Sequence, residues 1–350
     1  MEVARRGKIA GSTSRRAVLK AGAALGAAGL GLGAIFSPRV ARADGIKVSV
    51  INSSGNFSQV QVVLLKKLKL FEKYGIDADL LNVSDTNKIL AGLIGGDGDI
   101  CAGAGYTGLF PAIEKGATVK ILAGASVAPL NILYSNKPDI QSVKDLPGRT
   151  VGTGALGSLL HEQAVADMKK YGVDYHKVSF VNVGSSNDVF KALVGGSIDA
   201  GVAPIDFRDT AGKYNLHPLV DGEFWKELPL YVNQAMFASD KTIADKRKGL
   251  VGTMAAYGEM FRWIVNPANK LTWMQVYAEA FPKASPGEAE FLVDFLSQPR
   301  GLATDLVLSP EQINYVQDLN VELGVQQAVL PFDKCADMSL AQEAVKLMQS

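Results

Sequence analysis

Early in the chain, hydrophobic and polar positions follow patterns that predict alternating strands and helices. Lys47–Ile51 alternates between polar and apolar residues, which predicts a strand, and it runs into the polar loop Asn52–Asn56. Gln59–Tyr74 carries apolar residues at helical spacing, and Ile76–Val83 predicts a second strand. This alternation is typical of an α/β fold.

The pattern then repeats. Leu93–Ile100 and Leu193–Ala200 each combine the end of an apolar helix face, a Gly-Gly stop, an aspartate and the start of a short apolar strand. The aspartates are Asp99 and Asp199. A unit built twice predicts two α/β lobes that present their strand ends at corresponding places.

Two later stretches complete the expected organisation. Thr150–Gly152 predicts the first strand of the second lobe, and Leu230–Phe237 predicts another apolar strand. From Asp240 onward the pattern is almost entirely helical. Aromatic residues recur there at near-helical spacing, which favours a role in core packing: Phe261, Trp263, Trp273 and Tyr277.

The N-terminus resembles an export signal. The pair Arg15-Arg16 precedes the Ala/Gly-rich apolar run Ala21–Phe36, and an A-x-A pattern ends at Ala43. These features predict a twin-arginine signal peptide, residues 1–43, that is cleaved after Ala43 and sends the protein to the periplasm. A transmembrane anchor is disfavoured because the run is short and diluted by glycine.

Composition and charge narrow the function classes. The formal net charge is +1, so no strong field favours nucleic acid or an acidic membrane, and 47% hydrophobic residues suffice for buried cores. The chain has two cysteines. Cys101 lies in an apolar strand, which favours a buried free thiol, although an exported protein could also join it to Cys335.

Gly103–Gly108 has the spacing G-x-G-x-x-G, which in a dinucleotide-binding protein follows the first strand. Here it follows the third predicted strand, and Ala123–Ala128 lacks the acidic residue that would hold a ribose. A nucleotide is therefore disfavoured, while small residues still allow a ligand to approach the backbone closely.

Residues typical of catalysis or metal binding are not grouped along the chain. No G-x-S-x-G motif occurs, and the three histidines His161, His176 and His217 are scattered. We therefore predict no metal, no cofactor and no catalytic residue.

Polar loops rich in Ser, Thr, Asn and Gly follow the predicted strands. In open α/β sheets, ligands bind beyond the strand ends, and such loops suit reversible binding. Each loop could equally be a turn or a helix cap. They are Asn52–Asn56, Gly103–Thr107, Thr153–Ser158, Val183–Asn187 and Ala203–Asp206.

Taken together, the order and spacing of these features resemble the periplasmic substrate-binding proteins of ABC importers. The similarity is greatest to the branch for nitrate, sulfonates, taurine and thiamine precursors. Besides the export signal and the repeated Gly-Gly unit, the residues that carry it are Phe71–Ile76, Val143–Arg149 and Asn266-Pro267. The resemblance spans nearly all of residues 45–340.

The resemblance implies a type II periplasmic binding fold. Each of its two lobes would be a mostly parallel sheet flanked by helices, with a C-terminal helical segment. It implies residues 44–135 as the first part of lobe one, 136–232 as lobe two and 233–350 as the return to lobe one. The chain would cross between lobes near Leu133–Lys137 and Leu230–Phe237. A closed, ligand-bound form would dock on the membrane permease.

The resemblance also implies the ligand-binding residues. Lobe one would contribute Ser53, Ser54, Asn56, Gly105, Tyr106 and Thr107. Lobe two would contribute Thr153, Gly157, Ser158, Gly184, Ser185, Ser186, Asn187, Pro204 and Asp206. The backbone N–H groups of Gly157 and Ser158 would serve an oxyanion, and Tyr106 and Phe207 would stack on an uncharged heterocycle.

The nature of the ligand stays open between a sulfonate, a carboxylate and a heterocycle. No basic residue lies in the five loops, and the nearest, Arg208, is expected in a surface ion pair. We expect a monomeric binding protein rather than an enzyme. The alternatives are a two-lobed enzyme of the pyrimidine-precursor synthase type and an exported partner of a receptor.

Overall fold

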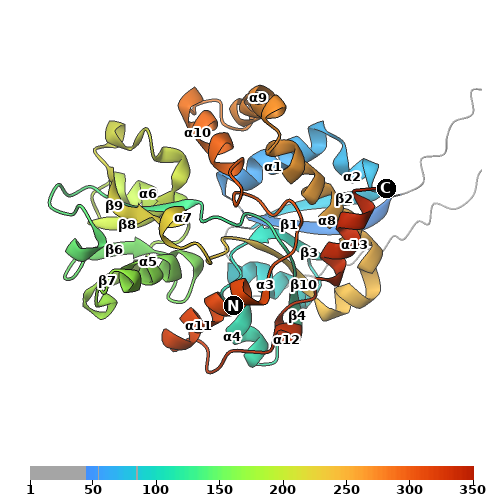
Figure 1. Ribbon diagram of the computed structural model, residues 1–350, viewed down its shortest axis with the longest axis horizontal. Coiled ribbons are helices and arrows are strands. Elements are labelled where there is room, and N and C mark those ends of the chain that lie inside the picture. Colours follow the sequence, from blue (N-terminus) through green and yellow to red (C-terminus); the bar gives the residue numbers. More distant parts are fainter. Residues whose placement is uncertain (1–44, 54, 84–85) are drawn as a thin grey trace, which may run out of the picture. The chain divides into compact units, whose positions relative to one another are not determined.

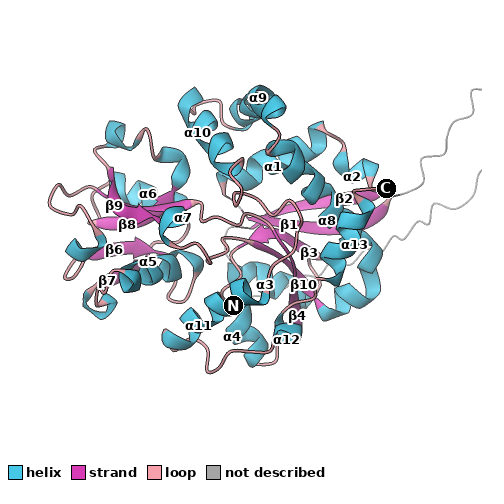
Figure 2. Cartoon of the chain, in the orientation of Figure 1, coloured by secondary structure: helices cyan, strands magenta, loops and turns pink. Residues whose placement is uncertain are grey.

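Within the described residues, ten strands form two five-stranded sheets, which Figure 2 shows in magenta between the helices. The computed structural model describes residues 45–53, 55–83 and 86–350. The predicted signal peptide and its cleavage site, and Ser54, lie outside the described residues. The described residues form one compact unit.

The first sheet has the order β2-β1-β3-β10-β4. Its strands are β1 (Ile46–Ser53), β2 (Ile76–Val83), β3 (Ile100–Ala104), β4 (Val119–Gly124) and β10 (Ala235–Ser239). Helices α1 (Asn56–Lys67), α2 (Leu70–Lys73), α3 (Thr86–Gly95), α4 (Leu109–Glu114), α8 (Asp240–Ile264) and α13 (Ser339–Leu347) belong to this lobe. The long helix α8 contacts β1, β2, β3, β4 and β10 of this sheet, and α13 packs on α8 (Figure 1).

The second sheet has the matching order β7-β6-β8-β5-β9. Its strands are β5 (Asn131–Ser135), β6 (Thr150–Thr153), β7 (Ser179–Asn182), β8 (Ala200–Pro204) and β9 (His217–Glu223). Its helices are α5 (Leu159–Lys170), α6 (Ser186–Val194) and α7 (Phe224–Glu227). The remaining helices are α9 (Lys270–Ala280), α10 (Pro286–Leu296), α11 (Pro310–Glu322) and α12 (Phe332–Cys335).

Both sheets are mixed but mostly parallel, as the resemblance implied. In each, four strands run in the same direction, and the fourth strand in order, β10 or β5, runs antiparallel to both neighbours. These two are the strands that enter from the other lobe. They begin at the edge where β1, β3, β6 and β8 end, so they run in the opposite direction.

The repeated Gly-Gly unit has one structural role in both lobes. The Asp99 carboxylate accepts the backbone N–H of Ser49 in β1 at 2.9 Å, and the Asp99 N–H donates to the Ser49 carbonyl at 2.8 Å. Asp199 makes the same pair with Thr150 in β6, at 3.0 Å in both directions. Each aspartate therefore joins the turn before one strand, β3 or β8, to the neighbouring parallel strand, β1 or β6. This shared role confirms the predicted internal repeat.

Three predicted boundaries differ from the structure. Asn131–Ser135 pairs with β8 and β9, so the first crossing precedes Asn131 and does not lie at Leu133–Lys137. The strand expected at Leu230–Phe237 begins at Ala235. The helix expected over Gln59–Tyr74 is broken at Lys69, whose φ of 53° is left-handed and cannot continue an α-helix.

The C-terminal region is helical, as predicted. Phe261, Trp273 and Tyr277 are buried and Trp263 is half-buried, which confirms their packing role. Among the described residues, no helix combines the length and the hydrophobicity that a membrane crossing requires.

Candidate functional site

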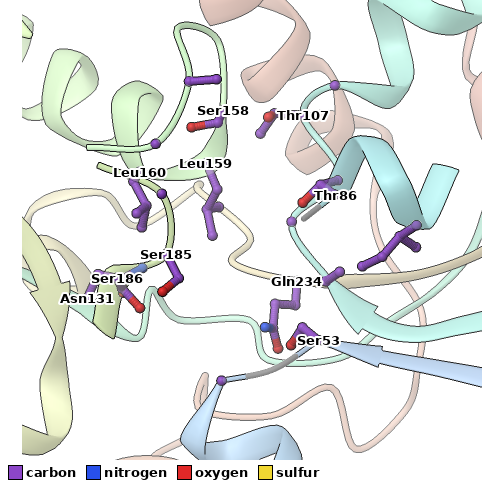
Figure 3. Close-up of a pocket in the computed structure, with 18 of the residues that line it drawn as sticks. Ser53, Thr86, Thr107, Asn131, Ser158, Leu159, Leu160, Ser185, Ser186 and Gln234 are labelled. Carbon is purple, nitrogen blue, oxygen red and sulfur yellow. The ribbon is translucent and has the colours of Figure 1, made fainter. Parts of the chain in front are cut away.

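A cavity of about 590 Å³ lies between the strand ends of the two sheets. Its walls come from the segments after β1, β2 and β3 in one lobe and after β6, β7 and β8 in the other, with both crossing segments. Figure 3 shows the hydroxyl-bearing side chains of Ser53, Thr86 and Thr107 opposite those of Ser158, Ser185 and Ser186. A cavity of this size is typical of small-molecule sites.

Most of the residues predicted from the sequence line this cavity. Those that do are Ser53, Asn56, Gly105, Thr107, Gly157, Ser158, Gly184, Ser185, Ser186, Asn187, Pro204 and Asp206. The structure therefore brings the strand-end loops of the two lobes together, as the repeated unit implied. Their contact with a solute stays a prediction.

Tyr106, Thr153 and Phe207 do not line the cavity, so their predicted positions are corrected. Tyr106 is fully buried with its ring edge-on to Phe110 at 5.8 Å, because burial of aromatic surface favours the core over the cavity. Phe207 stacks on Phe190, with ring centroids 3.8 Å apart. The Thr153 hydroxyl is buried and donates to the Gly154 carbonyl at 3.0 Å.

The two backbone N–H groups proposed for an oxyanion are already used within the protein. The Gly157 N–H donates to Nδ1 of His161 at 3.2 Å, and the Ser158 N–H donates to the Ala155 carbonyl at 2.9 Å. Burial lowers the pKa of His161 to about 4, so its neutral ring accepts this hydrogen bond near neutral pH. In this conformation these N–H groups stabilise the loop before α5, and a solute oxyanion would have to displace those hydrogen bonds to use them.

Side chains from the two lobes meet across the cavity. The Thr107 hydroxyl donates to the Gly157 carbonyl at 3.0 Å. The Asn56 amide donates to Asp206 Oδ2 at 2.9 Å and accepts from the Asn187 amide at 3.4 Å. These contacts join loops that the sequence separates by up to 150 residues, and they hold the lobes together around the cavity.

Gly105 provides the close approach that this arrangement needs. A Cβ atom at position 105 would lie 3.0 Å from Leu159 Cβ in the opposite lobe, closer than side chains ordinarily pack. Gly105 lies between β3 and α4, and Leu159 is the first residue of α5. The absence of a side chain at position 105 therefore lets the lobes close.

A chain of hydrogen-bonded amide side chains, linked through the Ser126 hydroxyl, connects the crossing segments; it was not predicted from the sequence. Asn131 donates to Gln163 at 2.9 Å, and Gln163 donates to Asn233 at 3.1 Å. Asn233 donates to Ser126 at 2.9 Å, and Ser126 donates to Gln234 Oε1 at 3.1 Å. Asn131 and Gln234, at the two ends, line the cavity (Figure 3). The signal available in the sequence was the presence of polar residues in the two crossing segments, next to apolar strands.

The start of α3 is a second part of the wall that was missed. Thr86, Asn87 and Lys88 line the cavity, and they follow β2, which ends at the same edge as β1 and β3. The strand-end argument that selected the other loops applies here too.

Among the described lining residues, the charged side chains are Lys88, Asp188 and Asp206. Lys88 is exposed. Asp188 caps α6 through Ser185 and pairs with Lys191 at 3.0 Å, which lowers the pKa of Asp188. Only Asp206 is deeply buried, with 5% of its surface exposed.

Burial raises the pKa of Asp206 above its usual range, although hydrogen bonds from Asn56 and Tyr277 oppose this shift. Arg208 does not neutralise it. Arg208 forms ion pairs with Glu223 and Asp209, as expected from the sequence, and lines a separate surface cavity.

Helices α1, α3, α5 and α6 each have their first residue in the cavity wall. The partial positive charge of a helix N-terminus favours acceptor groups there. Within the described residues, no cluster of three or more His, Cys, Asp or Glu side chains is arranged to hold a metal ion.

The sequence matches the family model described as NMT1/THI5 like over residues 56–267, more than half of the chain. The chain belongs to the NMT1/THI5-like family. The matched part includes most of the cavity wall, from the start of α1 through the second lobe. No curated protein matches the sequence at a significant level.

Solved structures share the fold of this NMT1/THI5-like protein. The alkanesulfonate-binding protein SsuA from Xanthomonas axonopodis pv. citri, bound to MOPS, is 17% identical with a TM-score of 0.65; the match covers 86% of this chain and 98% of that one. The periplasmic nitrate-binding protein NrtA from Synechocystis PCC 6803 is 13% identical with a TM-score of 0.70, over 87% and 90%. The desulfurization enzyme DSZB is 12% identical with a TM-score of 0.56, over 86% and 99%.

These matches confirm the predicted two-lobed α/β fold of the periplasmic binding proteins. Binding proteins and an enzyme share it, so the fold alone does not separate the two functions.

Proposed function

We propose that this protein is an extracytoplasmic solute-binding protein that captures a small organic solute between its lobes and delivers it to an ABC importer. The observation that carries the proposal is the cavity, whose walls come from both lobes and whose rim is joined by hydrogen bonds between them. A solute that contacts both walls favours the closed form, and a permease can recognise that form.

The chemistry of the wall supports binding over catalysis. Most of its polar side chains carry neutral hydroxyl or amide groups, such as Ser53, Thr107 and Asn131. The glycines in the wall allow a solute to approach the backbone. Nδ1 of His161 accepts the Gly157 N–H, so this nitrogen is not available as a base toward a solute.

The proposal includes export to the periplasm by the twin-arginine route, with cleavage after Ala43, and a monomeric mature protein. The paired arginines and the A-x-A pattern support export, as does the periplasmic nitrate-binding protein that shares the fold. N-terminal sequencing of protein recovered from the periplasm tests the route and the cleavage site. Light scattering of that protein tests the oligomeric state.

A thermal-shift screen tests the binding function. Sulfonates, carboxylates, nitrate and pyrimidines are each added to the mature protein, and the bound probe is then recovered and analysed. A probe at a hundredfold excess over Kd should stabilise the protein by about 2.7 kcal/mol. Reversible binding without conversion supports the proposal. Conversion of a probe to product would instead favour the enzyme, and stabilisation by no probe would contradict both binding and delivery.

Delivery is tested separately from binding. A permease reconstituted with its ATPase in vesicles should take up the bound probe only when the loaded protein is present. If the loaded protein binds a receptor ectodomain and leaves uptake unchanged, the protein is a sensor partner and the importer assignment is wrong.

A further inference from the structure

The deepest charged group among the described residues of the cavity wall is Asp206. Its surface is 5% exposed, and it follows β8 in the short turn Ile205–Phe207. Among the described residues, no ion pair joins Asp206 to a lysine or arginine. The adjacent Arg208 is turned to Glu223 and Asp209. A buried carboxylate without a cation is costly unless hydrogen bonds or a ligand compensate for it.

The protein compensates for this carboxylate only in part. Asn56 donates to Oδ2 at 2.9 Å, the Tyr277 hydroxyl approaches the same oxygen at 3.4 Å, and the backbone N–H of Asp206 also donates to the carboxylate. All three donors are neutral, and the two side chains come from the side of the first lobe. A carboxylate accepts about four hydrogen bonds through its two oxygens, so Asp206 has capacity for further donors from the cavity.

The position of Asp206 also discriminates between classes of solute. A sulfonate, carboxylate or nitrate placed beside an ionised Asp206 would be repelled, and the low dielectric of a buried site strengthens this repulsion. The N–H groups proposed for an oxyanion are engaged within the protein, as described above. An ammonium, amino or amidine group would instead donate a hydrogen bond to Asp206 and so compensate for the burial of its carboxylate.

We propose that the solute of this cavity presents a nitrogen-bound hydrogen to Asp206, so the protein selects amino- or amidine-bearing solutes over isosteres that lack the N–H donor. This inference rests on the proposed binding function. It does not specify the other functional groups of the solute. Acceptor groups elsewhere on the solute can face a helix N-terminus at the cavity wall, such as that of α5.

Two isosteric pairs of probes test the inference by calorimetry. Taurine is compared with propanesulfonate, which replaces the ammonium by a methyl group, and aminopyrimidine is compared with methylpyrimidine. For at least one pair, the wild-type protein should bind the amino member roughly tenfold to hundredfold more tightly, the range expected for a hydrogen bond to a charged group.

Asp206→Asn is the matching variant. Its amide oxygen can still accept from Asn56 and Tyr277, but its NH₂ group opposes another donor. The preference for the amino member should fall to within about threefold, mainly through weaker binding of that member. Asp209→Asn is the control, because Asp209 is exposed, pairs with Arg208 and does not line the cavity.

The outcomes separate the inference from the function on which it rests. Equal binding within both pairs, tighter binding of the methyl members, or an unchanged preference in Asp206→Asn would overturn the inference. Binding of propanesulfonate or nitrate alone would also overturn it and would leave the binding function intact. Binding of no probe would count against both. If Asp206→Asn does not fold, the wild-type comparison of the pairs still decides.

Discussion

Removal of the Asp99 side chain tests how the repeated unit holds each lobe together. Asp99→Ala deletes the acceptor of the Ser49 N–H, at 2.9 Å, and the partner of Lys246, at 2.8 Å. A hydrogen bond to a charged group contributes roughly 1.5–3 kcal/mol, and a partly exposed ion pair about 0–1 kcal/mol. Ser49 is half-buried, so water can hydrate its N–H in the variant. We therefore expect the free energy of unfolding to fall by about 2 kcal/mol.

Asp199→Ala makes the equivalent change in the second lobe. The Thr150 N–H loses its acceptor at 3.0 Å, and the Lys137 pair is longer, at 3.9 Å. Since this ion pair is weaker, a slightly smaller loss is expected, about 1.5 kcal/mol. Asp97→Ala is the control, because that aspartate is exposed, and its effect should stay within about 0.5 kcal/mol.

Urea unfolding followed by circular dichroism measures all three variants, and ellipticity is recorded at several wavelengths to detect separate unfolding of the lobes. Asp99→Ala and Asp199→Ala should both lower the midpoint, and Asp97→Ala should not. If either of the first two matches Asp97→Ala, the shared structural role of the repeat is wrong.

Three further predictions follow from the described residues. Burial, with nearby carboxylates, raises the pKa of Asp167 to about 8, so the native state holds a proton that the unfolded state has lost above about pH 4. The contribution of Asp167 to stability should therefore fall as pH rises from 4 to 8, by about 5 kcal/mol or less, and the difference between the wild type and Asp167→Asn in urea titrations at each pH isolates this contribution. Burial also raises the pKa of Cys101 to about 12 and that of Cys335 to about 11, so a thiol reagent should label neither until the protein unfolds, and both thereafter. Gly105→Ala places a methyl group 3.0 Å from the opposite lobe and should weaken binding of the preferred amino probe about tenfold in calorimetry, whereas Gly212→Ala, with open space around the added atom, should not.

Much of the fold could be predicted because periodicity and turn residues are local properties. The strand Ile76–Val83 was predicted with its observed bounds, and the Gly-Gly units located the turns before β3 and β8. The assignment of Asn131–Ser135 to its sheet could not be predicted, because an apolar strand gives no sign of which lobe it pairs with. That depends on long-range hydrogen bonds to β8 and β9.

The candidate site was predictable in outline for the same reason. Strand-end loops share one edge of a sheet, so Ser53, Thr107 and Ser186 could be expected together. Side-chain direction was not predictable, and Tyr106 turned into the core. The Gly157 N–H was expected to serve a solute, but it donates to Nδ1 of His161, four residues on. This contact depends on the path of the loop, which the sequence does not show.

Native mass spectrometry of the mature protein with the probe panel tests the central claim most directly. We expect a one-to-one adduct with a small organic probe, most abundant for an amino-bearing member. The adduct should require a higher collision energy for unfolding than the protein without a probe. The probe should be released unchanged on denaturation. An absence of adducts with every probe, or release of a chemically altered probe, would contradict the account.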